Sequence, residues 1–151
     1  MKHKHFTNIV FTILVLLCSL ALLAISIQLM WKLGIYTDEH NTSPAAVWGG
    51  ELWNLLDWAV LLLAAVIAVL SCAMLMHRFI SGMVFVCSLV LLAIGMKLMW
   101  NLGLYADAHS TSFAEIWGGG LWNLLSWARL LLTGVMAALS GAMLKKPKHR
   151  I

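Results

Sequence analysis

The chain has 151 residues, of which 62% are apolar and 11% are charged. Soluble domains are typically about 45–50% apolar and about 25% charged, so this composition excludes an ordinary water-soluble fold. The net charge of +4 does not indicate nucleic-acid binding, because the basic residues gather mostly at the termini and no basic stretch is interleaved with aromatic residues.

Residues 1–26 superficially match a secretory signal peptide, because Lys2 and Lys4 precede an apolar run. The run continues to Trp31, which is longer than the roughly 7–15 residues of a signal-peptide core, and no small-residue cleavage site follows it. Leu17 also breaks the pattern required for lipoprotein processing at the next residue. We therefore expect this segment to remain in the protein as a membrane anchor.

Four apolar runs occur along the chain, at residues 8–33, 52–77, 79–101 and 121–144. Each run is long enough to cross the bilayer, since a helix of about 20 apolar residues spans the hydrocarbon core. The sequence therefore predicts an all-α membrane protein with four transmembrane helices.

The second half of the chain repeats the first. Residues 22–75 and residues 91–144, offset by 69, are identical at 35 of 54 positions. All 8 tryptophans pair across this offset: Trp31/Trp100, Trp48/Trp117, Trp53/Trp122 and Trp58/Trp127. The sequence thus predicts a tandem duplication of a two-helix unit, with residues 1–78 as the first repeat and residues 79–151 as the second. Two crossings per repeat give both repeats the same orientation.

Basic residues indicate how the chain is oriented. They precede the first run, join the second run to the third and follow the fourth: Lys2 and Lys4, then His77 and Arg78, then Lys145, Lys146, Lys148 and Arg150. Because basic loops face the cytoplasm, we expect both termini there and a multi-pass location in the bacterial inner membrane. The other two connections hold or adjoin all 6 acidic residues and are expected to face outward.

The two outward connections share the pattern Gly-[Ile/Leu]-Tyr-x-Asp-x-His-x-Thr-Ser, followed by Trp-Gly-Gly. We expect Gly34 and Gly103 to end the first helix of each repeat. Trp48, Trp53 and Trp58 are five residues apart and would point in different directions on a helix, so they mark depth rather than one face. The tryptophans are therefore predicted to form an interfacial aromatic belt, with a base-stacking, quinone or cationic-ligand site as the alternative.

The Asp-x-His pattern places Asp38 with His40, and Asp107 with His109, at corresponding positions. These side chains could bind zinc or another divalent transition metal if the repeats brought them together. The spacing is also common in polar loops, so we expect the four residues to stabilise the loops and predict no metal or other cofactor. The cysteines give neither a disulfide framework nor a metal-binding spacing: Cys18, Cys72 and Cys87.

Corresponding positions that differ in charge cluster near the outer helix ends: Gln28/Lys97, Lys32/Asn101, Glu51/Gly120, Asp57/Ser126 and Val60/Arg129. Arg129 lies deeper than any acidic residue, and a cation at the bilayer centre costs at least about 2.5–3.5 kcal/mol. We predict an intramembrane charge cluster of Asp57, Lys97 and Arg129, in which Asp57 pairs with Arg129 and Lys97 joins them or extends toward the interface. A ligand or anion site that uses Arg129 and Lys97 is the alternative.

Enzyme motifs for nucleotide binding, serine hydrolysis or zinc proteolysis are missing from the sequence, and we expect no catalytic activity. The composition favours a small membrane protein that acts through helix packing with a membrane partner or a second copy, as accessory, regulatory or protective subunits do. Small residues such as Ala64 and Gly134 would allow close helix contact. The alternative is a small oligomeric transporter or channel with a polar outward vestibule between the repeats.

Overall fold

The computed structural model describes residues 2–74 and 76–144, with only the backbone of Lys4 included. Its long helices are α1 (Lys2–Glu39), α3 (Glu51–Ser71), α4 (Arg78–Ala108) and α6 (Gly120–Leu144). Two short helices lie in the connections, α2 (Pro44–Trp48) and α5 (Phe113–Trp117). The 4 long helices are all long and apolar enough to cross a membrane, which confirms the predicted all-helical class and the four candidate spans.

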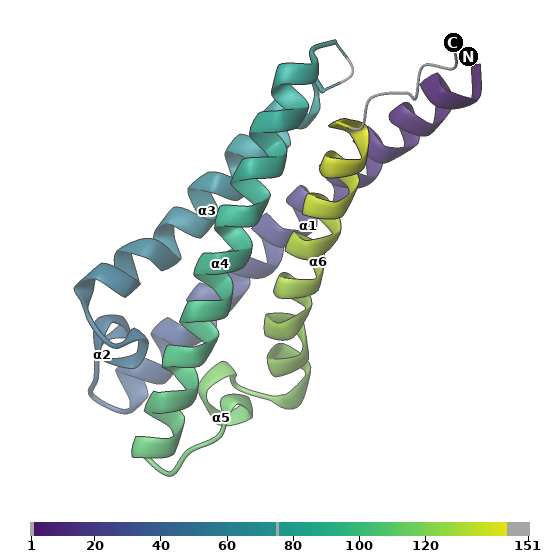
Figure 1. Ribbon diagram of the computed structural model, residues 1–151. Coiled ribbons are helices and arrows are strands. Elements are labelled where there is room, and N and C mark those ends of the chain that lie inside the picture. Colours follow the sequence, from purple (N-terminus) through teal and green to yellow (C-terminus); the bar gives the residue numbers. More distant parts are fainter. Residues whose placement is uncertain (1, 75, 145–151) are drawn as a thin grey trace.

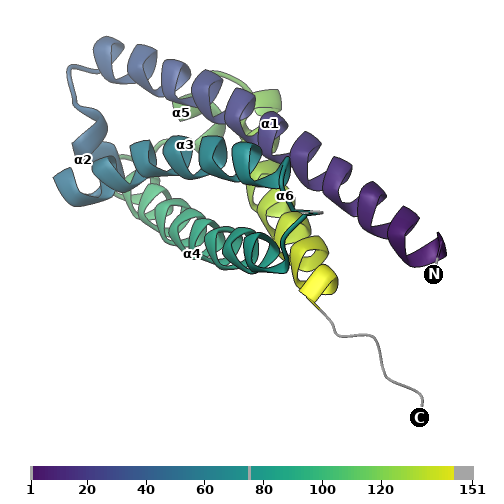
Figure 2. The ribbon, with the colours of Figure 1, turned by 90° about the horizontal axis from the view of Figure 1, so that it is seen from above.

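The long helices form one bundle (Figure 1). Helices α1 and α4 each contact both α3 and α6, so the four make a ring in which α1 lies diagonally opposite α4. Figure 2 shows the same bundle from above. The short helices lie at one end, here called the α2/α5 end. The start of α1, the α3–α4 connection and the end of α6 lie at the other, called the terminal end.

Buried positions recur every three or four residues along α1, α3, α6 and the first part of α4, as in a coiled-coil seam. Residues 69 apart are buried in both halves, as with Ser19 and Ser88 or Leu22 and Leu91. Most buried hydroxyls bond within their own helices: Ser19 Oγ donates to the Leu16 carbonyl at 2.8 Å, and Ser88 Oγ to the Val84 carbonyl at 2.8 Å. Ser26 Oγ is an exception, buried without a hydrogen-bond partner. Small side chains with satisfied hydrogen bonds therefore let the helices pack closely.

Helices α1 and α4 continue beyond Gly34 and Gly103, so the prediction that these glycines end the helices is wrong. The buried side chains of Tyr36 and Tyr105 extend the inward-facing stripe past each glycine. Helices α1 and α4 also each contact both short helices. Helix α3, by contrast, ends at Ser71, before the predicted end of its apolar run at residue 77.

The short helices begin and end with strong local signals. Ser43 Oγ caps α2 by accepting a hydrogen bond from the Ala46 amide at 3.2 Å, and Ser112 caps α5 in the same way. Gly49 and Gly118 then end these helices with φ of 91° and 85°, a left-handed conformation that favours glycine.

Each short helix packs against both halves of the chain. Helix α2 contacts α1 and α3 of its own half and α4 of the other, and α5 contacts α4 and α6 of its own half and α1 of the other. A Cβ placed on Gly49 would lie 3.8 Å from Asn101 Nδ2, and one on Gly118 would lie 3.7 Å from Lys32 Cδ. Because residues 32 and 101 correspond in the two halves, the exchange of contacts is reciprocal.

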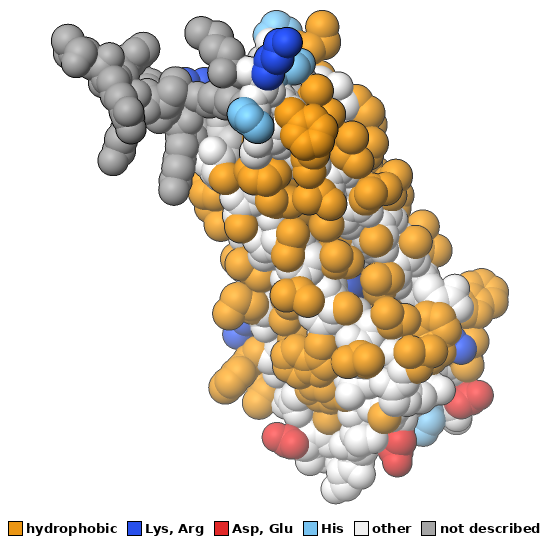
Figure 3. Space-filling model, turned by 90° about the vertical axis from the view of Figure 1, so that its right-hand side faces the viewer, with side chains coloured by type: hydrophobic (Ala, Val, Ile, Leu, Met, Phe, Trp, Pro, Cys, Tyr) orange, Lys and Arg blue, Asp and Glu red, His pale blue; other side chains and the backbone are white. Residues whose placement is uncertain are grey.

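The surface separates by chemistry along the bundle. On the face in Figure 3, hydrophobic side chains cover most of the length between the ends, and a basic group with histidines lies at the terminal end. Acidic groups and a histidine lie at the α2/α5 end, with further Lys or Arg groups just above them. This distribution matches a bundle with a lipid-facing middle. The basic residues Lys145, Lys146, Lys148 and Arg150, used above to orient the chain, lie outside the described residues.

Candidate functional site

Two opposite charges are buried in the α2/α5 half of the bundle. Asp57 on α3 and Arg129 on α6 are only 2% and 8% exposed. Each side chain lies within electrostatic range of the other, although no ion pair or hydrogen bond joins these two described residues and their helices face one another diagonally across the ring. Two of the three residues of the predicted charge cluster are therefore buried within electrostatic range of each other, and their direct pairing stays a prediction.

Lys97 lies elsewhere. Its side chain is exposed on α4, and its ammonium lies 5.6 Å from the centre of the Trp53 ring. Lys32 makes the reciprocal contact from α1, 5.0 Å from the centre of the Trp122 ring. Both lysines therefore form cation–π contacts on the bundle instead of approaching Arg129.

Trp48 and Trp117 are buried between the halves. They are the largest fully buried side chains, and their ring centres lie 6.1 Å apart. The Arg129 guanidinium carbon lies 6.0 Å from the Trp117 ring centre, so the buried cation also faces an indole. The aromatic-belt interpretation does not describe these two residues. The other six tryptophans are exposed or partly exposed: Trp31, Trp53, Trp58, Trp100, Trp122 and Trp127.

The centre of the ring is nearly filled. A space of about 20 Å³ remains beside Arg129 and Thr133, bounded by Leu22, Leu91 and other apolar side chains from all four long helices. This volume admits about one water molecule. In the described residues, the bundle axis therefore offers no wide passage.

The Asp-x-His residues lie at the ends of α1 and α4. His40 stacks on Tyr36 with ring centres 4.1 Å apart, His109 stacks on Tyr105 at 4.0 Å, and the two tyrosines meet edge to face at 6.4 Å. Each histidine Nδ1 bonds the carbonyl of the tyrosine four residues earlier, at 2.9 and 3.0 Å. Within residues 2–74 and 76–144, no group of three or more His, Cys, Asp or Glu side chains is placed to hold a metal.

A groove of about 470 Å³, here called the first groove, lies between α1, α2 and α3. Its apolar walls include the exposed side chains of Trp31 and Trp58. Three polar residues, Gln28, Asn54 and Asp57, also line it. Asp57 therefore lines this groove and also lies within electrostatic range of Arg129.

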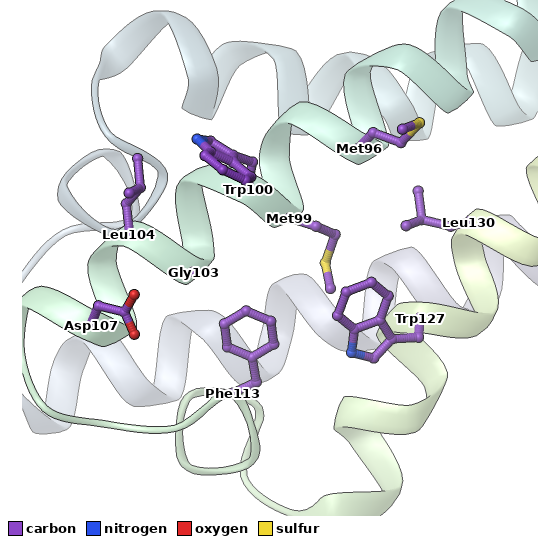
Figure 4. Close-up of a pocket in the computed structure, with 9 residues that line it drawn as sticks. All are labelled: Met96, Met99, Trp100, Gly103, Leu104, Asp107, Phe113, Trp127 and Leu130. Carbon is purple, nitrogen blue, oxygen red and sulfur yellow. The ribbon is translucent and has the colours of Figure 1, made fainter.

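The second half has a corresponding groove of about 420 Å³, here called the second groove, between α4, α5 and α6. Seven lining positions match across the halves: 27/96, 30/99, 31/100, 34/103, 44/113, 58/127 and 61/130. Figure 4 shows Met99, Phe113 and Trp127 converging from three elements, with Asp107 at one end.

The grooves were not predicted from the sequence, although the signals for one wall were present. A serine cap followed by a glycine six residues later marks a short helix, and these helices supply Pro44 and Phe113 to the grooves. The meeting of α1 with α3 and of α4 with α6 depends on tertiary packing and has no local signal. Family models, curated proteins and solved structures were all compared with this chain, and none of them matches it.

Proposed function

We propose that the chain is a noncatalytic multi-pass membrane protein that acts by packing against a transmembrane helix of a partner, as an accessory, regulatory or protective subunit. The observation that carries this proposal is the polar lining of the first groove, where Gln28 and Asn54 are partly exposed beside the buried Asp57. Lipid tails cannot hydrogen-bond these side chains, whereas a helix with a polar residue can. The groove therefore favours a protein occupant.

The small residues of α3 and α6 contribute less to such a surface than the sequence indicated. Ala64, Ala68, Ser71 and Ala137 are buried within the bundle, so they serve its internal packing. We therefore assign partner contact to the first groove and to the exposed apolar side chains beside it. The partner is another protein or a second copy of this chain.

The proposal includes a tandem duplication and a location in the bacterial inner membrane with both termini cytoplasmic. Matching burial at positions 69 apart, reciprocal packing of the short helices and paired grooves support the duplication. The basic residues Lys2 and Arg78, which begin α1 and α4 at the terminal end, support the orientation.

Site-specific photo-crosslinking in native membranes tests partner binding. A benzophenone amino acid at Leu61, which lines the first groove, is expected to give one discrete adduct, whereas the same group at Val69, exposed on α3 outside the groove lining, is expected to give none. An adduct of twice the chain mass would identify a second copy as the partner.

The variant Gln28→Lys, which introduces the residue of the second repeat, supplies a matched control. It should abolish the Leu61 adduct, because it replaces a neutral hydrogen-bonding side chain with a cation in the groove. Equal adducts at Leu61 and Val69, or an adduct insensitive to this substitution, would contradict the proposal.

A transporter or channel is the second candidate, and the polar residue Asp57 beside the groove is the observation that favours it. Because the central space of a single described bundle is about 20 Å³, transport would require an oligomer. The mass of the detergent-solubilised protein, followed by a flux assay in proteoliposomes, distinguishes a transporter from a partner-packing subunit.

A further inference from the structure

The second groove contains an aromatic surface of a kind that the first lacks. The rings of Phe113 and Trp127 stack with centres 6.2 Å apart, and Trp100 and Met99 lie along the same groove. In the first groove the position of Phe113 is occupied by Pro44, so one of the three rings is missing.

An exposed carboxylate completes this surface. Asp107 lines the second groove and, in Figure 4, directs its carboxylate toward the side that holds Phe113. Its counterpart Asp38 is not among the residues that form the first groove, and the carboxylate there, Asp57, is already attracted to Arg129.

Aromatic faces and a carboxylate together attract an ammonium group, because both present negative electrostatic potential to it. The remaining walls of the groove, including Met96 and Leu130, are apolar and suit a hydrocarbon body. We propose that the second groove binds an amphiphilic cation, with its amine or quaternary ammonium head between Asp107 and the aromatic rings and its apolar part along α4 and α6. This site is independent of partner packing at the first groove.

Binding to the full chain in lipid nanodiscs tests the proposal. The probe is benzyltrimethylammonium, and its uncharged isostere neopentylbenzene is the comparison; equilibrium dialysis measures both against empty nanodiscs of the same phosphatidylglycerol. We expect saturable binding of the cation, and affinity for the uncharged isostere about tenfold weaker.

Substitutions assign this binding to the groove. Asp107→Asn and Phe113→Pro should each weaken cation binding about tenfold, whereas the matched variants Asp38→Asn and Pro44→Phe should leave it unchanged. Phe113→Pro introduces the residue that already begins α2, so the short helix is expected to form. A melting curve for each variant confirms that the bundle is intact.

Two lipid compositions distinguish the sources of such a head group. Added phosphatidylethanolamine should compete with the probe if the natural occupant is an amine-bearing lipid, and should leave its affinity unchanged if the occupant is a free hydrophobic amine. Either result retains the site and assigns its source. Equal affinity for the cation and its isostere, or wild-type affinity in Asp107→Asn, would overturn the proposal. The proposal would also be overturned if the chain bound no cation and a photo-crosslinker at Leu104, in the second groove, captured a protein.

Discussion

Replacing Arg129 with valine is expected to lower the free energy of unfolding by about 3–5 kcal/mol, and Asp57→Ser is expected to lower it by a similar amount. Each substitution leaves one charge buried without its opposite. Valine and serine are the residues at the corresponding positions of the other repeat, where Val60 and Ser126 are also buried, so neither introduces an unfamiliar side chain.

The double variant separates loss of the pair from loss of either side chain. Asp57→Ser with Arg129→Val should recover much of the stability, with an incomplete recovery because the contact of Arg129 with Trp117 is also lost. A double-mutant cycle in mixed detergent micelles measures the coupling, and the exposed Asp38→Ser is the control, expected within about 0.5 kcal/mol of wild type. Additive losses would reject the pair.

Trp117→Ala is expected to destabilise the bundle by about 3–5 kcal/mol, because it removes a fully buried ring that packs on Trp48 and faces Arg129. Trp117→Phe should cost much less. Phenylalanine keeps an aromatic surface, and the indole Nε1 that it removes is buried without a hydrogen-bond partner.

Trp100→Ala provides the comparison for this prediction. Its side chain is 66% exposed, so its loss should change the free energy of unfolding far less, by the same denaturant titration. Equal losses for Trp100→Ala and Trp117→Ala would show that Trp117 is not part of a packed interior.

The four long helices were predictable because each apolar run exceeds the length needed to cross a bilayer. Their ends were less predictable. Hydropathy ends near Trp31 and Trp100, yet α1 and α4 continue because Tyr36 and Tyr105 pack inward against the opposite half. Such stabilisation comes from tertiary contacts that a local pattern does not contain.

Charge differences between the two halves of the chain predicted a pair of Asp57 and Arg129, since a deep cation favours the nearest deep acid. Both side chains are buried within electrostatic range of each other. The sequence did not show that Lys97 lies apart from Asp57 and Arg129, because the direction of its side chain depends on which face of α4 packs inward. The sequence does not separate Trp48 and Trp117 from the interfacial tryptophans. They differ because they lie on the short helices between the halves.

Cysteine accessibility in intact cells tests the transmembrane arrangement most directly. In a cysteine-free background, single cysteines at Thr42 and Thr111, both at the α2/α5 end, should react with an impermeant maleimide added outside, and one at Lys148 should react only after permeabilisation. Labelling of Lys148 with protection of both threonines would reverse the orientation. Labelling of only one threonine would contradict the four-helix bundle with both short helices on one side of the membrane.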